Sequence, residues 1–306
     1  MDVPRLSTIQ ALLLLLKARE SAPKRGYYFR SWMTVKKLVT MAHDLELHEH
    51  YHEHRIGRGC ECDPTECLVR TRIWQNIFVC EIMIGGPQGT RKCANNASKV
   101  KLISIGRTDM GVDPETVDLE VPLSLPAIDG SDYQISRHFT YFVRKVRSVR
   151  AMHDIKGSAK TKIGEPLDFV TDPKFVALSS TLSLWLDSLP TDLQVKFPDD
   201  ETPPWLPSHF VGNMHSYYHL TVIMLHRPQL MRSSSYANGN WKMHMAVCYS
   251  SAKAMCRLQE AVLQTFGLSG LLYMQRGINF VIYAVLTCTM IHLVCWSALG
   301  NSQWSC

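Results

Sequence analysis

The sequence predicts an all-α fold, a multi-helical bundle of antiparallel helices with a long proline-rich connection. Three observations predict it. Apolar residues recur at three- and four-residue spacing along most of the chain, and the alternation typical of strands is scarce. The composition, 46% hydrophobic and 20% charged, is that of a globular protein with a substantial core. We therefore expect residues 1–306 to form a single helical domain.

Two N-terminal blocks predict packed helices. The first begins near Phe29 and places its apolar residues on one helical face: Trp32, Val35, Leu38, Val39, Ala42 and Leu45. The second begins near Leu68 and becomes apolar nearly all round by Ile84. A helix without a polar face has to lie between other helices, so we expect the second block at the centre of a bundle.

The second half of the chain alternates between helical and irregular patterns. Residues 154–206 collect six prolines and predict an irregular connection with one short helix. Ser208–Arg227 then predicts a helix stopped by Pro228, and Trp241–Phe266 predicts another closed by Gly267. Because the loop between these two helices is short, they should be antiparallel neighbours.

The C-terminal segment 278–299 supports two interpretations. No Asp, Glu, Lys or Arg occurs from Gly277 to Cys306, so a helix here is long and apolar enough to cross a bilayer. Five polar residues interrupt the segment, and no basic cluster follows it. We favour a buried helix, with a membrane-attached helical protein as the alternative.

Charge and cysteine usage narrow the class of protein. A net charge of +6 permits an acidic partner but falls short of a strong nucleic-acid footprint. Ten scattered cysteines do not form a disulfide framework, which indicates a reducing compartment. No signal-peptide pattern opens the chain, no phosphate-binding loop or nucleophile elbow occurs, and we predict no catalytic and no cofactor-binding residue.

One motif suggests metal chemistry. His48, Glu49 and His52 match the zinc-hydrolase pattern in which two histidines bind the metal and the glutamate activates water. That mechanism needs a well-packed helix, whereas the preceding helix is expected to end near His48. We therefore predict a solvated histidine-rich loop and no metal ligand, with adventitious or regulatory metal binding and a zinc hydrolase as alternatives. Cys60, Cys62 and Cys67 lack the spacing of a six-cysteine zinc cluster.

A further set of landmarks follows the two N-terminal blocks. A Leu-Glu-Leu-His segment ends the first block, basic residues and a tryptophan open the second, a Gly-Pro turn closes it, and the acidic segment 111–122 follows. The individual landmarks are Leu47, His48, Arg70, Arg72, Ile73, Trp74, Gly86 and Pro87. Together they resemble the middle regulatory region of fungal zinc-cluster (Zn2Cys6-type) transcription factors. The departures are Glu46 for the usual glycine, Gln75 for a second aromatic residue, and Gly85-Gly86-Pro87 for Gly-Arg-Pro.

This resemblance implies a nuclear, non-enzymatic regulator. It implies control of transcription by RNA polymerase II, of metabolic genes, with DNA and zinc bound only through an N-terminal cluster that this chain lacks. The expected partners are transcriptional co-regulators or a small-molecule effector, with a second copy of the chain as a further candidate and no membrane. Buried aromatic and histidine residues are the candidate effector pocket, or alternatively plain core: Trp74, Trp205, His209, His215 and Tyr218.

Two segments interrupt the resemblance. Residues 90–107 intervene where the family pattern would pass directly to the acidic segment, and we expect them to be an insertion or a retained intron. Residues 297–306 are likewise off-pattern. We accordingly interpret the chain as a regulatory domain truncated at both ends.

Overall fold

The fold was analysed in a computed structural model that describes residues 4–21, 25–55, 59–85, 111–159, 173–230 and 240–300. These residues form nine α-helices and no strand, and the structure is 78% helical. The predicted all-α class is therefore confirmed. Contacts group the residues into two compact units, 1–157 and 158–306, and the single regulatory domain over 1–306 stays a prediction. A polypeptide of this length contains enough apolar residues for two separate cores.

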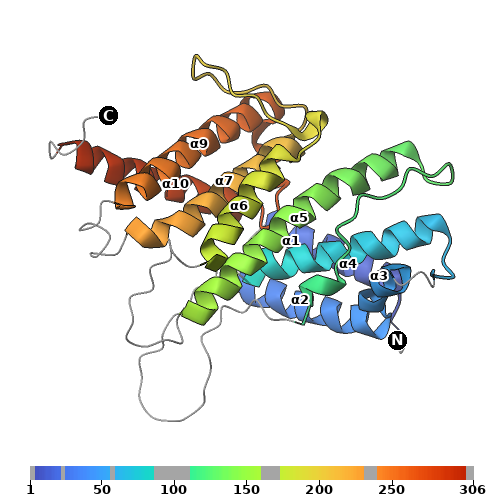
Figure 1. The fold of residues 1–306 in the computed structure, drawn as a ribbon. Helices are drawn as coiled ribbons and strands as arrows, with labels where there is room; N and C mark the ends of the chain where they lie inside the picture. Colours follow the sequence, from blue (N-terminus) through green and yellow to red (C-terminus); the bar gives the residue numbers. More distant parts are fainter. Residues whose placement is uncertain are drawn as a thin grey trace, which may run out of the picture. The chain divides into compact units, whose positions relative to one another are not determined.

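The first unit is built around one central helix (Figure 1). Its elements are α1 (Leu6–Ser21), α2 (Tyr27–Asp44), α3 (Leu47–Arg55), α4 (Pro64–Gly85), the 3-10 turn η1 (Pro114–Thr116) and most of α5 (Gly130–Ala159). Helix α4 contacts α1, α2 and α3. This confirms the prediction that the helix lacking a polar face lies between others.

The core of the first unit follows the predicted stripes. In α2 the residues Val35, Leu38, Val39 and Ala42 are buried, as their spacing requires. In α4 the fully or almost fully buried residues are Ile77, Phe78, Val79, Cys80, Ile82 and Ile84. Burial of such side chains contributes roughly 1.5–3 kcal/mol each before the entropy of ordering the chain is counted.

A sharp turn separates α2 from α3. Helix α2 ends where the backbone N–H of Leu45 donates to the carbonyl of Met41, and Glu46 then adopts a left-handed conformation with φ 56°. The chain reverses within two residues and resumes as α3 at Leu47. The predicted solvated loop over the histidines was therefore wrong, since residues 47–55 are helical.

The segment 111–122 connects α4 to α5 through hydrogen bonds. The indole N–H of Trp74 donates to Thr116 at 3.1 Å, and the amide of Gln75 donates to the carbonyl of Asp118 at 2.8 Å. From the α5 side, Arg144 donates to the carbonyl of Leu119 at 2.7 Å. The acidic segment that the sequence singled out thus lies against α4, whereas Gly86, Pro87 and the predicted insertion at 90–107 lie outside the described residues.

The second unit is a series of antiparallel helices. They are α6 (Pro173–Asp187), α7 (His209–Leu230), α9 (Asn240–Leu272) and α10 (Ile278–Gly300), with the 3-10 turn η2 (Thr191–Leu193) before α7. Cross-helix contacts run in opposite sequence directions along α7 and α9: Asn213 bonds the carbonyl of Gly270, Gln259 bonds Ser216, and His226 bonds His244. The predicted antiparallel pairing is confirmed.

Two boundaries in the second half differ from the prediction. Helix α7 runs through Pro228 to Leu230, because a proline near the last turn costs little once tertiary packing holds the helix. The segment 154–206 is less irregular than its prolines indicated, since α5 continues to Ala159 and α6 occupies fifteen residues. Gly267 does interrupt α9, with φ 67° and ψ −171°, although helical structure resumes beyond it.

Helix α10 matches the predicted segment 278–299. Its features are compatible both with a buried helix and with a membrane-spanning helix. Its window Ile278–Trp296 has a mean hydropathy of 2.0 and is long enough to cross a membrane, and 33% of that window is buried. The buried side contacts α9 and α7. The other side exposes Ile282, Leu286, Met290 and Leu293.

Candidate metal centre

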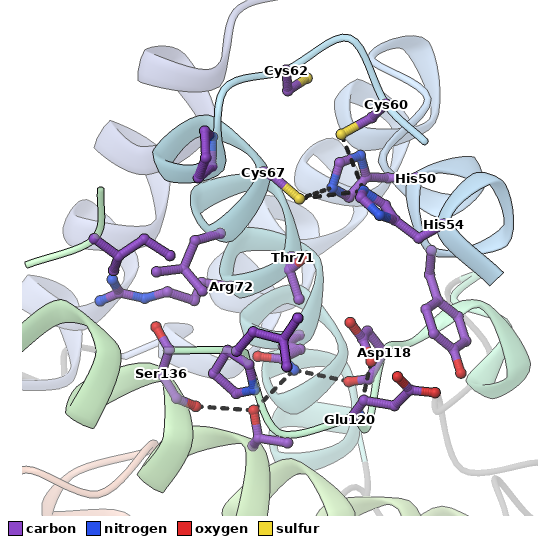
Figure 2. Close-up of a pocket in the computed structure, with 18 of the residues that line it drawn as sticks. His50, His54, Cys60, Cys62, Cys67, Thr71, Arg72, Asp118, Glu120 and Ser136 are labelled. Atoms are coloured by element: carbon purple, nitrogen blue, oxygen red, sulfur yellow. Dashed lines mark hydrogen bonds between the residues drawn. The ribbon is translucent and has the colours of Figure 1, made fainter. Parts of the chain in front are cut away.

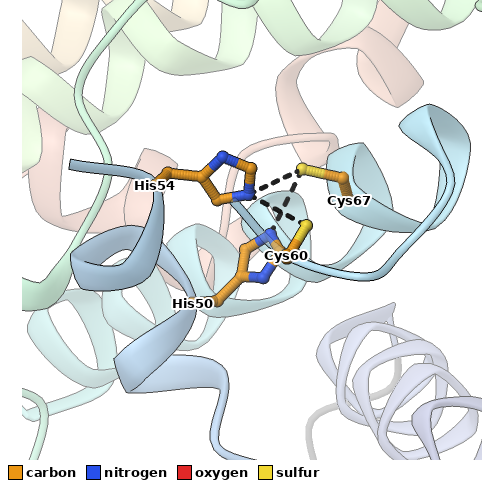
Figure 3. A group of neighbouring side chains, drawn as sticks. All are labelled: His50, His54, Cys60 and Cys67. Atoms are coloured by element: carbon orange, nitrogen blue, oxygen red, sulfur yellow. Dashed lines mark hydrogen bonds between the residues drawn. The ribbon is translucent and has the colours of Figure 1, made fainter. Parts of the chain in front are cut away.

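Three neighbouring elements bring four metal-binding side chains together at one edge of the first unit. His50 and His54 come from α3, Cys60 from the loop that follows, and Cys67 from the first turn of α4 (Figure 3). Each side chain offers one ligand atom, and these atoms all lie within 4.8 Å of one another. Among the residues described, this is the one such group of histidine, cysteine and acidic side chains.

Local sequence explains why these four residues meet. His50 and His54 are four residues apart on a helix, so their rings project from the same face. Gly59 takes φ 68°, a conformation that favours glycine, and turns the chain back after α3. Asp63 then caps α4, its carboxylate accepting from the N–H groups of Thr65 and Glu66 at 2.8 and 2.9 Å.

The distances suit a tetrahedral metal ion. The sulfur of Cys67 lies 3.3 Å from Nε2 of His50 and 3.2 Å from Nε2 of His54, and the sulfur of Cys60 lies 3.0 Å from Nε2 of His54. Ideal tetrahedral zinc, with Zn–N near 2.0 Å and Zn–S near 2.3 Å, requires nitrogen–sulfur separations of roughly 3.6 Å. Side-chain movements of a few tenths of an ångström would therefore admit the ion.

Burial shifts the pKa values of two of these four side chains. Burial, together with the neighbouring Cys60, raises the pKa of the Cys67 thiol to about 12. Burial and the adjacent His54 lower the pKa of His50, which favours the neutral ring that a metal needs. A bound cation would reverse the effect on the thiols, because thiolate is the ligand form, so metal binding should release protons.

A hollow of about 510 Å³ adjoins the four ligands. Cys60 and Cys67 lie on one side of the hollow, and Ser136 of α5 lies on the opposite side (Figure 2). Thr140 of α5 also lines the hollow. The Ser136 hydroxyl is buried and has no hydrogen-bond partner among the residues that the structure describes. Asp118 also lines the hollow, and its burial raises the pKa of its carboxyl group. Part of the lining of the hollow, beside His50, His54, Cys60 and Cys67, is therefore polar.

The third nearby cysteine, Cys62, plays a different part. It lines the same hollow, but its sulfur makes no hydrogen bond to either histidine among the described residues. In Figure 2 its side chain lies apart from the contacts that join the other sulfurs to the histidine rings. It is therefore a neighbour of the cluster and a natural control for it.

The residues of the zinc-hydrolase pattern do not form a metal site in the described part of the chain. His48 and His52 are both on α3, but the His48 ring lies 4.3 Å from that of His43 and 6.4 Å from that of Trp74. His48 and His52 share a separate hollow with Glu49. The pattern lies on the same helix as His50 and His54, but Cys60 and Cys67 lie beside His50 and His54 and not beside His48 and His52.

The landmarks of the fungal resemblance occupy structural positions in the first unit. Leu47 and Ile73 are buried. Arg70 bonds Glu66 and the carbonyl of Leu45, tying α4 to the α2–α3 turn, and Arg72 forms an ion pair with Asp132 of α5. These contacts give each of the four residues a structural role in the packing of the first unit.

The five residues of the predicted effector pocket are distributed over the two units. Trp74 belongs to the first, where it contacts the imidazole rings of His43 and His48. In the second unit Trp205 is exposed and His209 stacks on Tyr273. His215 bonds the carbonyl of Leu193, and Tyr218 stacks on Trp185. The contacts of His215 and Tyr218 are those of packed core residues, whereas His209 is only partly buried and its stacking partner Tyr273 is exposed.

Comparison with known proteins gave no match to a family model, to a curated protein or to a solved structure. The resemblance to the fungal regulatory region accordingly stays a prediction.

Proposed function

We propose that this protein is a zinc-stabilised helical regulator, in which one zinc ion bound by His50, His54, Cys60 and Cys67 holds α3 and its loop against α4. The convergence of four ligand atoms within 4.8 Å of one another carries the proposal. Two imidazole and two thiol donors form the set that structural zinc sites use.

Zinc is the metal that this donor set favours. Thiolate and imidazole are poor ligands for calcium and magnesium, which prefer oxygen. Soft and borderline metals accept them, and a tetrahedral arrangement of two sulfurs and two nitrogens is typical of zinc. The spacing between the histidines fits the usual range, whereas that between the cysteines is longer, as expected when the loop must pass from one helix to the next.

The proposed role is structural and not catalytic. Catalytic zinc sites have three protein ligands and keep a fourth position for water or substrate, whereas here the protein supplies all four ligands. A centre of this type would stabilise α3 and thereby shape one wall of the adjoining hollow. Occupancy of the hollow by a small-molecule effector could then shift the balance between two arrangements of the unit.

This role is compatible with the regulatory function that the sequence resemblance implies. We propose that the chain acts in the nucleus as the regulatory region of a transcription factor. Binding of an effector or a co-regulator to this region would control the activator or repressor to which it is attached. Support comes from the all-α fold and from the packing of the acidic segment against Trp74 and Gln75. In this proposal the zinc of the helical region is separate from the zinc that a DNA-binding cluster would hold.

The decisive experiment measures bound zinc. The full chain, purified without chelator, should contain about one zinc ion per molecule by inductively coupled plasma mass spectrometry. Cys67→Ser and His50→Ala should each lose it, because a three-ligand site binds far more weakly. Cys62→Ser is the matched control and should retain it.

The same series separates the competing sites. Retention of full zinc content by both Cys67→Ser and His50→Ala would overturn the proposal. Loss of zinc from His52→Ala, with hydrolytic activity abolished by Glu49→Gln, would favour the hydrolase alternative instead. Circular dichroism of each variant would show whether lost zinc simply reflects lost folding.

A membrane-attached protein is the second candidate function, favoured by the exposed apolar side of α10. Against it, α10 packs on α9 near Cys256, and the adjoining turns of α9 carry Lys253 and Arg257, whose burial in lipid would be costly. Pelleting of the full chain with neutral phosphatidylcholine vesicles, stable to high salt, would support this candidate. Recovery in the supernatant would count against it.

A further inference from the structure

A second group of reactive side chains lies in the second unit. Cys256 is on α9, and Cys288 and His292 are on α10, one helical turn apart on the face that meets α9. The Cys288 thiol also donates to the carbonyl of Ala252 at 3.5 Å, one helical turn before Cys256, and both thiols line the same hollow. Two thiols from different helices thus lie at one site.

The two thiols differ in access. Cys256 is exposed, whereas Cys288 is 3% exposed. A hollow of about 510 Å³ opens onto both of them and onto His292. Its remaining lining is mainly apolar: Ala284, Val285, Leu293 and Trp296. Gln259, which is 9% exposed, also lines this hollow, and its buried side-chain oxygen has no hydrogen-bond partner among the residues that the structure describes. A small molecule with an apolar body would therefore find an apolar surface beside the two thiols.

We propose that Cys256 is a modification site for hydroperoxides, with Cys288 as the thiol that converts the product into a disulfide between α9 and α10. The juxtaposition of an exposed thiol, a buried thiol and an imidazole at one hollow supports this. It is independent of the zinc centre, which lies in the other unit and uses other cysteines.

The pKa shifts of the two thiols agree with Cys256 as the thiol that reacts first and Cys288 as the thiol that forms the disulfide. Hydrogen bonds from Cys288 and His292 lower the pKa of Cys256 to about 6, so most of this thiol is thiolate at neutral pH. The same contact with Cys256 raises the pKa of Cys288, which keeps it protonated until it is needed. The His292 ring is held by an edge contact with Tyr249, 5.2 Å between centroids.

The chemistry balances in two steps. The Cys256 thiolate attacks one peroxide oxygen; a sulfur–oxygen bond forms, the oxygen–oxygen bond breaks, and the leaving alkoxide takes a proton and departs as the alcohol. Cys288 then attacks the sulfenic sulfur, forming the disulfide and releasing the hydroxyl group as water with the Cys288 proton. Overall, two thiols lose two electrons and two protons, and the hydroperoxide is reduced to alcohol and water.

The test treats the full chain with an equimolar hydroperoxide, followed by N-ethylmaleimide and peptide mass spectrometry. The expected product is a cross-linked peptide pair containing Cys256 and Cys288. Cys256 should react at least about 10-fold faster than Cys248, which is buried on the same helix with a pKa raised to about 12. Parallel arms with hydrogen peroxide and cumene hydroperoxide distinguish a small polar oxidant from an apolar one, and bridge formation in either arm supports the site.

Variants make the proposal falsifiable. In Cys288→Ser, and in Cys288→Ala should the serine variant misfold, Cys256 should stop at the sulfenic acid that dimedone traps. His292→Gln should slow the first step, and Cys248→Ser should change nothing. The proposal is overturned if Cys256 reacts no faster than Cys248 in both arms, or if its disulfide partner is a cysteine other than Cys288.

Discussion

Nδ1 of His226 and Nδ1 of His244 lie 2.8 Å apart in the interior of the second unit, joining α7 to α9 by an imidazole–imidazole hydrogen bond. One ring must donate and the other must accept, so the two rings cannot both be charged. Phe175 of α6 presents an edge-on contact to each ring, at 5.4 and 6.1 Å. This pair makes the second unit sensitive to acid.

Acid should therefore loosen α7 from α9. Burial, and secondarily the neighbouring His244, lower the pKa of His226 to about 4 in the folded state, against about 6.5 in an unfolded chain. Because the unfolded chain binds more protons between these values, the stabilisation is complete above about pH 6.5 and is lost as the pH falls toward 4. The full effect is roughly 3 kcal/mol.

Hydrogen exchange of peptides from α7 and α9 at pH 7.5 and 5.5 would measure this dependence. His226→Asn should flatten it while lowering stability at neutral pH, and His219→Asn is a control outside the pair. An unchanged pH dependence in His226→Asn would show that other groups are responsible.

Replacing Glu46 by glycine should stabilise the first unit. Glu46 occupies the left-handed region at φ 56°, where a side chain costs roughly 1–2 kcal/mol and glycine does not. We expect Glu46→Gly to raise the free energy of unfolding by about 1 kcal/mol in urea denaturation. Glu46→Ala is the matched control, since it removes the carboxylate but keeps the Cβ. If Glu46→Ala stabilised the unit as much as Glu46→Gly, the charge of Glu46 and not its backbone conformation would be the cause.

Adding one methyl group at Gly212 should separate α7 from α9. A Cβ there would lie 2.5 Å from Val262 and 2.7 Å from Leu206, both buried side chains. Gly212→Ala should therefore destabilise the second unit by about 1–3 kcal/mol, measured by urea unfolding. The double variant with Val262→Ala removes the nearer contact and should recover part of the loss. If the destabilisation of the double variant equalled the sum of those of the two single variants, the steric explanation would be contradicted.

Removing the metal should destabilise the first unit selectively. At free zinc roughly a hundredfold above its Kd, binding adds about 3 kcal/mol of stability. A chelator should therefore lower the midpoint of thermal unfolding and raise hydrogen exchange in residues 47–72, and re-added zinc should restore both. Cys67→Ser should already behave like the chelated protein. A chelator effect that persists undiminished in Cys67→Ser would locate the metal elsewhere.

Sequence periodicity predicted the helices well where one face is buried. The stripe of α2 and the unbroken apolar surface of α4 translate directly into burial, because side-chain spacing alone decides which residues share a helical face. The antiparallel pairing of α7 and α9 was also predictable, since a short loop permits little else. Pro228 was misleading because tertiary packing outweighs a local helix-breaking tendency.

The candidate metal site was only partly visible in the sequence. The histidine-rich stretch and the three nearby cysteines were evident, yet the literal motif selected His48 and His52. What that reasoning missed was the second His-x3-His pair, His50 and His54, whose spacing was a usable signal. Which pair faces the cysteines depends on the left-handed turn at Glu46 and on the return of the chain at Gly59.

The sequence by itself determined the helical class, the central place of α4 and the apolar character of α10, because these depend on residue spacing and composition along one segment. Only the tertiary structure decided that the chain forms two units, that His50, His54, Cys60 and Cys67 meet, and that Cys256 and Cys288 line one hollow. Each of those depends on how separate segments approach one another, and the direction of a side chain across a turn or between helices is set by packing that no local pattern encodes.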